Sequence, residues 1–179
     1  LHQNTKNIAN AGFIEKLLSP DKFKSNGNGA STKLNSIISM ILNCTNENNI
    51  SILLSDNIFS ISGSQPAHVL LAKCKIKMTE VFLEKMKELE SNNQPSLSTT
   101  IIQLYSQFNG NYWDYKHPTG RASQQLNCKR PYYMCVIGVN DLVSDFNNKF
   151  DVNEMNGYKN KYTLTEINAL NPKCSVLAN

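Results

Sequence analysis

The sequence has 179 residues, of which 40% are hydrophobic and 18% charged, and its formal net charge is +4. This length suits one domain with its own core and is short for two. Lysine is scattered along the chain, whereas nucleic-acid binders usually gather basic residues on one face, so the charge predicts an ordinary solvated surface.

The N-terminal third of the chain predicts two helices and a buried strand. Apolar residues at helical spacing predict a short helix over residues 8–18. A polar loop with two glycines then leads to a second helix, which begins near Ser31 or Thr32 and continues to about Asn43. The segment Ile50–Asp56 is a nearly continuous aliphatic run without polar alternation. Such a run is typical of a strand that is buried on both faces of a parallel sheet.

The rest of the chain alternates helical and extended patterns. In the first of these helices, Leu71 belongs to the expected apolar stripe and Lys85 to the charged residues around it. The predicted elements are, in chain order, a helix over His68–Leu89, a strand over Thr99–Phe108, a long polar loop over residues 109–130, a strand over Pro131–Gly138, and a short helix from Asn140 or Asp141 to Phe150.

This order of elements predicts an α/β domain with a Rossmann-like sheet, mainly parallel central strands and helices on both faces. We expect Ile50–Asp56 and Pro131–Gly138 to be central neighbours that run in the same direction. Residues 1–179 are expected to form one domain, with residues 151–179 as an irregular C-terminal extension that adds at most a strand or a docked segment. Because the chain opens with Leu1, an alternative is a fragment that lacks the first strand of its domain.

A glycine-containing loop thus reaches Thr32 and opens a helix, and a later buried strand ends in Ser55 and Asp56. This arrangement resembles the middle of a von Willebrand factor type A domain, over about Ser25 to Gly138. In that family a loop threonine and an aspartate at the end of a later strand help to form a metal-ion-dependent adhesion site. The resemblance implies that Thr32 and Asp56 bind a divalent metal such as Mg²⁺. The family's Asp-x-Ser-x-Ser motif is absent from this chain and would have to precede Leu1.

The chemistry of the two side chains allows two interpretations. Mg²⁺ prefers hard oxygen ligands, which the hydroxyl of Thr32 and the carboxylate of Asp56 would supply at the carboxyl edge of a parallel sheet. Alternatively, Thr32 caps its helix and Asp56 caps the turn after its strand, and no metal is needed. We favour the capping interpretation, because two ligands alone make a poor metal site.

Aromatic and cationic side chains are mixed in and around the expected loop over residues 109–130. Such a mixture suits a protein interface anchored by aromatic and arginine side chains, and it also suits stacked single-stranded bases. A third interpretation is that the aromatic rings fold back over the sheet edge. The candidate partner-binding residues are Tyr112, Trp113, Tyr115, Arg121 and Arg130.

No complete catalytic set is recognisable in the sequence. The five cysteines form no Cys-x-x-Cys pair, which favours reduced thiols in a cytoplasmic protein. We therefore expect a non-enzymatic module that binds another protein, with no membrane partner. One alternative is a metal-assisted hydrolase or nuclease that uses Asp56 with Asp114 or His117. The other is single-stranded nucleic-acid binding, which is possible but not favoured.

Overall fold

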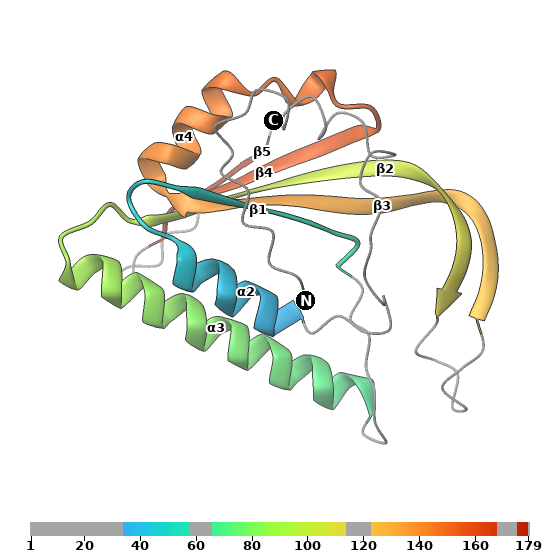
Figure 1. The fold of residues 1–179 in the computed structure, drawn as a ribbon, viewed down its shortest axis with the longest axis horizontal. Coiled ribbons are helices and arrows are strands. Elements are labelled where there is room, and N and C mark those ends of the chain that lie inside the picture. Colours follow the sequence, from blue (N-terminus) through green and yellow to red (C-terminus); the bar gives the residue numbers. More distant parts are fainter. Residues whose placement is uncertain (1–33, 58–65, 114–122, 168–174, 179) are drawn as a thin grey trace.

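The structure, a computed structural model, describes residues 34–57, 66–113, 123–167 and 175–178 (Figure 1). Its elements are α2 (Leu34–Cys44), β1 (Ile50–Ser55), α3 (Ala67–Ser91), β2 (Leu97–Trp113), β3 (Ser123–Val139), α4 (Asn140–Lys149), the 3₁₀ turn η2 (Val152–Glu154), β4 (Tyr158–Ile167) and β5 (Ser175–Ala178). The predicted helices over residues 68–89 and 140–150 are confirmed to within two residues at each end. The helix expected over residues 8–18 lies outside the described residues.

The described strands form one five-stranded sheet in the order β1-β3-β2-β4-β5, and every neighbouring pair is antiparallel. The prediction of a Rossmann-like sheet with mainly parallel central strands is therefore wrong. The strands β2 and β3 follow one another in the chain and pair along their whole length. A short connection allows this pairing for antiparallel strands, whereas parallel strands need a crossover connection of about a dozen residues or more.

The strand β1 is a neighbour of β3 as expected, but it runs in the opposite direction and is the outermost strand on its side of the sheet. Its register runs from Ile50 opposite Gly138 to Ser55 opposite Tyr133. All of its residues are half-buried. Leu53 packs on the cluster formed with α2 and α3, whereas Ile52 packs on the opposite cluster with α4. Helices on both faces thus account for the continuous aliphatic run without any parallel pairing.

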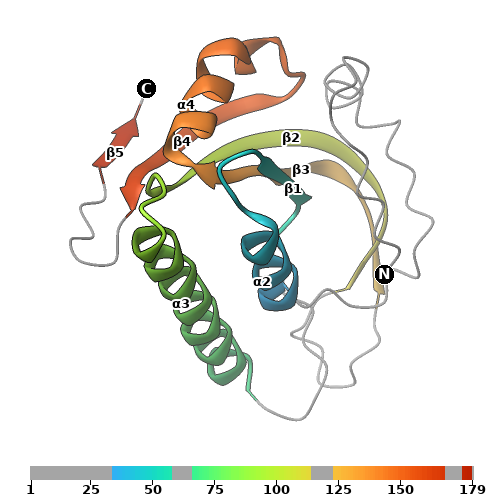
Figure 2. The same cartoon turned by 60° about the vertical axis from the view of Figure 1, so that its left-hand side comes forward.

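The sheet is the middle of three layers (Figure 2). On one face, α2 and α3 enclose a core whose largest fully buried side chains include Leu42, Leu89 and Leu97. On the other face, α4 and η2 cover a second core that contains Ile102 and Met134. The tail after Asp151, expected to be irregular, contributes β4 to the interior of the sheet and β5 to its far edge.

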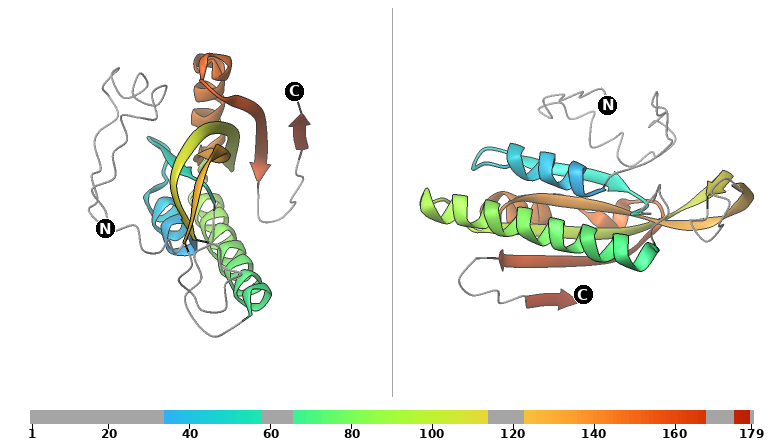
Figure 3. Two further views of the ribbon diagram at one scale, coloured as in Figure 1. Left: turned by 90° about the vertical axis from the view of Figure 1, so that its right-hand side faces the viewer. Right: turned by 90° about the horizontal axis from the view of Figure 1, so that it is seen from below.

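The hairpin of β2 and β3 continues beyond the rest of the sheet. Pairing of β2 with β4 ends at Leu104, opposite Tyr158, and pairing of β3 with β1 ends at Tyr133. Beyond these points the two strands pair only with each other, from Tyr105 opposite Pro131 to Trp113 opposite Ser123. We call residues 105–113 and 123–131 the ribbon. Most of the expected polar loop over residues 109–130 is therefore strand, and the ribbon projects beyond the rest of the sheet and bends there (Figures 1 and 3).

Candidate functional site

One face of the ribbon carries an aromatic and cationic cluster. Because side chains alternate along a strand, Phe108, Gly110 and Tyr112 of β2 share this face with Cys128 and Arg130 of β3. The guanidinium of Arg130 lies 4.1 Å from the centre of the Tyr112 ring. At this distance the cation is attracted by the electron-rich face of the ring. We call Phe108, Tyr112 and Arg130 the aromatic cluster.

The contact between Tyr112 and Arg130 shows how strongly the ribbon bends. Arg130 is directly opposite Ser106, six residues before Tyr112. In a straight strand six residues span about 20 Å, beyond the reach of an arginine side chain. The aromatic cluster therefore lies on the inner side of the bend. Gly110 lies between its members, and a Cβ added there would already be 3.4 Å from the ring of Phe108, so a larger side chain would crowd the cluster.

The opposite face of the ribbon is lined by amides. The Nε2 of Gln107 donates to the Oδ1 of Asn127 at 2.7 Å, and the Nε2 of Gln125 donates to the Oδ1 of Asn109 at 3.4 Å. All four side chains are exposed. The ribbon therefore has one aromatic and cationic face and one face of mainly neutral amides, which also carries the exposed Lys129 opposite Gln107. A two-stranded ribbon is marginally stable in water on its own, so we expect its inner face to favour a contact that buries it.

The structure describes three of the five predicted partner-binding residues. Tyr112 and Trp113 lie at the end of β2, and Arg130 lies in β3, so they belong to strands and not to a loop. Tyr115 and Arg121 lie outside the described residues. Sequence reasoning missed Phe108 as a member of the same cluster. The alternation of Phe108, Gly110 and Tyr112 would have revealed it, but the neighbouring asparagine and glutamine residues indicated a loop.

The predicted metal pair is not assembled by the described part of the chain. Thr32 lies outside it, as do Asp114 and His117, the suggested catalytic partners of Asp56. Asp56 follows β1 and is exposed. Because β1 runs antiparallel to its neighbour, its end is not a shared carboxyl edge of parallel strands, which was the premise of the site. Among the residues that the structure describes, no group of three or more His, Cys, Asp or Glu side chains could hold a metal ion.

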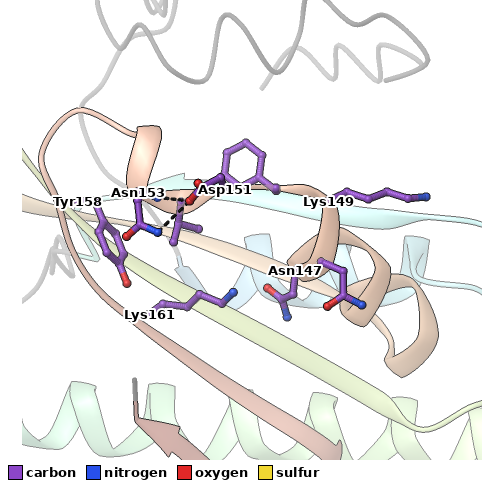
Figure 4. Close-up of a pocket in the computed structure, with 9 residues that line it drawn as sticks. Asn147, Lys149, Asp151, Asn153, Tyr158 and Lys161 are labelled. Carbon is purple, nitrogen blue, oxygen red and sulfur yellow. Dashed lines mark hydrogen bonds between the residues drawn. The ribbon is translucent and has the colours of Figure 1, made fainter.

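A polar pocket of about 480 Å³ lies where α4, η2 and β4 meet (Figure 4). The Oδ1 of Asp151 accepts hydrogen bonds from the backbone nitrogen and the Nδ2 of Asn153, both at 2.9 Å, which fixes the wall formed by η2. Lys149 pairs with Asp145 at 2.8 Å and points away from the pocket (Figure 4). Lys161, from β4, is half-buried and extends along the wall of the pocket. The pocket could hold a small polar or anionic group.

Behind this pocket a short chain of hydrogen bonds joins α4 to two strands. The Nδ2 of Asn147 donates to the Oγ1 of Thr100 at 2.8 Å, and that oxygen lies 3.1 Å from the Oγ1 of Thr163. Thr100 and Thr163 are buried, and the Oδ1 of Asn147 is buried without a hydrogen-bond partner. This network fixes the position of α4 on the sheet, and Asn147 belongs to the support of the pocket wall.

The thiols of Cys74, which is buried, and Cys135, which is half-buried, are poorly suited to nucleophilic catalysis. Burial raises the pKa of Cys135 above its ordinary value of 9.0. Burial also raises the pKa of Cys74, and a backbone hydrogen bond involving Asn35 opposes that rise. An activated cysteine needs a lowered pKa. Neither thiol therefore provides an activated nucleophile.

Comparisons with known proteins do not assign the chain to a family. No protein-family model, curated protein or solved structure matches it. In the described part of the chain, no helix combines the length and the apolar character that a membrane span requires.

Proposed function

We propose that this chain is a non-enzymatic protein-interaction module and that its ribbon binds another protein. The supporting observation is the aromatic cluster on the inner side of the bend, with Arg130 4.1 Å from the ring centre of Tyr112. Tyrosine and arginine are enriched among the residues that dominate binding energy at protein interfaces. The ribbon extends beyond the five-stranded part of the sheet, so a partner would reach this face without disturbing the two cores.

The proposal concerns a protein partner rather than a single-stranded nucleic acid. Stacking on aromatic rings serves single-stranded nucleic acids best when a positively charged groove follows the backbone. The outer face of the ribbon instead carries mainly the neutral amides of Gln107, Asn109, Gln125 and Asn127, and Lys129 is the one charged side chain among the described residues of that face. Binding to nucleic acid would weaken steeply as salt is raised. We expect the affinity for a protein partner, which buries the aromatic rings, to depend less on salt than affinity for a nucleic acid would.

The proposal includes no Mg²⁺, because the pairing of Thr32 with Asp56 assumed a parallel sheet. We therefore expect partner binding to survive treatment with EDTA. Loss of binding on chelation, restored by Mg²⁺ and abolished by Asp56→Ala, would contradict this part of the proposal. We further propose a cytoplasmic location, which is supported by the exposed free thiols of Cys44 and Cys128.

A photo-crosslinking experiment tests the proposed interface. A photoreactive amino acid is placed at Cys128, which is exposed on the same face of the ribbon as the aromatic cluster, and in a matched control at Glu90 on α3, which is also exposed. We expect a protein to be captured from Cys128 and not from Glu90. The captured protein is then purified and titrated against the wild type and two variants, Tyr112→Ser and Arg130→Gln. Each variant should raise the Kd about tenfold or more. Unchanged affinity in both variants would overturn the proposal.

A further inference from the structure

The helix α3 carries a second apolar stripe on the side that faces away from the sheet. Ile76 and Leu83 are 59% and 41% exposed, and Ala72 and Thr79 are exposed as well. Their spacing of four, three and four residues aligns them along one line of the helix. We call these four residues the outer stripe. Figures 2 and 3 show that α3 is an outermost layer of the described structure.

The outer stripe is not needed to hold α3 on the sheet. The buried side chains of the helix include Val81, Met86 and Leu89, which belong to the core on the inner side. A helix that uses one face for the core ordinarily presents polar residues on the other. The outer stripe instead has the spacing of a coiled-coil seam, and two of its four side chains are large and apolar. This pattern indicates a surface that another helix can cover.

The charges along α3 indicate which helix that is. The exposed charges of its N-terminal half are basic, and those of its C-terminal half are mainly acidic. A second α3 lying antiparallel would bring each half against the half of opposite charge, whereas a parallel one would bring like charges together. The basic residues of the first half are Lys73, Lys75 and Lys77, and the second half has Glu80, Glu84, Glu88 and Glu90 with Lys85 and Lys87.

We infer that two copies of this chain associate through antiparallel α3 helices packed along the outer stripe. A two-fold axis between Lys77 and Met78 places Ile76 against Thr79 of the second copy, and Ala72 against Leu83 of the second copy. The same axis brings Lys73 on the flank of the stripe near Glu80 of the second copy, and the symmetry repeats this pair. The interface is therefore self-complementary in charge, and it places each large apolar side chain of the stripe against a smaller one.

The length of α3 limits the strength of this dimer. Its 25 residues give a helix of about 37 Å at the rise of an α-helix. One helix pair of this length buries less than the ~1,200–2,000 Å² of a stable protein interface. We therefore expect a reversible dimer whose Kd is micromolar rather than nanomolar.

Sedimentation velocity of the full chain, from micromolar to submillimolar concentration, tests the inference. We expect a monomer–dimer equilibrium that Ile76→Glu weakens about tenfold or more, because it places a charge in the seam. Leu71→Glu is the matched control, because Leu71 is 49% exposed on the same helix but lies off the outer stripe. The dimer affinity of this variant should equal that of the wild type. A wild type that stays monomeric at every concentration would overturn the inference, as would a dimer that Ile76→Glu leaves intact.

A charge exchange tests the antiparallel arrangement without touching the apolar seam. Lys73→Glu and Glu80→Lys should each weaken the dimer, since each brings like charges together across the interface. The double variant restores both pairs and should recover the affinity of the wild type. Failure of the double variant to recover would overturn the antiparallel register. Circular dichroism of each variant verifies that the helical content is unchanged.

Discussion

The backbone N–H of Tyr105 donates a 2.8 Å hydrogen bond to the carbonyl oxygen of Gly157, at the point where the ribbon leaves the sheet. This bond follows a register irregularity between Gln103 and Leu104 in the pairing of β2 with β4. Gly157 has a φ of +82°, and a Cβ at this position would overlap the carbonyl oxygen of Tyr105. The base of the ribbon therefore depends on a residue without a side chain.

We predict that Gly157→Ala destabilises the protein by at least about 2 kcal/mol, through the left-handed backbone and the clash with Tyr105. Urea unfolding followed by circular dichroism measures the change. Gly110→Ala is the control, because a Cβ there makes an ordinary contact of 3.4 Å with the ring of Phe108. Equal stability of the two variants would mean that the backbone at Gly157 is not constrained as described.

The ion pair between Lys85 and Glu88 should respond differently to removal of each partner. The side chain of Lys85 is only 6% exposed, and its Nζ lies 2.9 Å from the Oε1 of Glu88. Glu88→Gln leaves a buried ammonium without its counter-charge and should cost about 1–3 kcal/mol. Lys85→Met removes the buried charge and should be neutral or stabilising. A thermal-unfolding comparison in which Lys85→Met is the more damaging change would refute this assignment.

The exposed pair of Lys149 and Asp145 provides the matched control for that comparison. Its side chains are 75% and 55% exposed, and its atoms are 2.8 Å apart. Water screens such a pair, so Lys149→Met should change stability by less than about 0.5 kcal/mol.

The hydrogen bonds that join α4 to the sheet predict a non-additive set of mutations. Thr100→Val removes the partner of both Asn147 and Thr163. Leaving these buried polar groups without partners should cost about 1–3 kcal/mol. The triple variant Thr100→Val, Thr163→Val and Asn147→Leu should lose less stability than the sum of the losses in its three single variants, because no polar group of the network is then left without a partner. Additive losses in denaturant titrations would argue against a connected network.

Stability should fall at alkaline pH through the half-buried thiol of Cys135. Burial raises the pKa of Cys135 in the folded protein above its ordinary value of 9.0, so the unfolded chain loses this proton first. The resulting stabilisation is complete below pH 9 and is lost as pH rises from there toward the raised pKa, by at most about 1.4 kcal/mol per pH unit.

Cys135→Ala should therefore flatten the pH dependence of the free energy of unfolding above pH 9. Cys128→Ala is the control, because Cys128 is exposed on the ribbon. Burial also raises the pKa of Tyr132 above its ordinary value of 10.0, so some alkaline loss should persist in the Cys135 variant above pH 10. Identical pH profiles for the wild type and Cys135→Ala would contradict the account.

Local periodicity predicted the helices of this protein better than it predicted the sheet. Apolar residues in Leu34–Cys44 and Asn140–Lys149 recur every three or four residues, which indicates a helix directly, because they form one stripe that faces one core. The aliphatic run Ile50–Ser55 indicates burial on both faces but not strand direction. An antiparallel sheet covered by helices on both sides produces the same pattern as a parallel one. The strand order is set by long-range pairing, which a single sequence does not display.

The same limit applies to single residues of α3. Both Leu71 and Lys85 have the helical spacing of an inner stripe or its border. Leu71 is nevertheless 49% exposed, and Lys85 is buried. Which face of a helix is covered depends on how far its neighbours extend along it. Of the candidate site, the sequence identified Tyr112 and Arg130 by their chemistry, but not the bend that brings them together.

Trimming the ribbon tests the central claim most directly. Replacing residues 107–129 with Asn-Gly joins Ser106 to Arg130, which face each other in the hairpin, through a two-residue turn. Both cores lie outside the deleted segment, so the trimmed protein should fold with unchanged helical content. Isothermal titration with the protein captured from Cys128 should then show binding to the wild type and none to the trimmed variant. Binding of the trimmed variant with the affinity of the wild type would contradict the account.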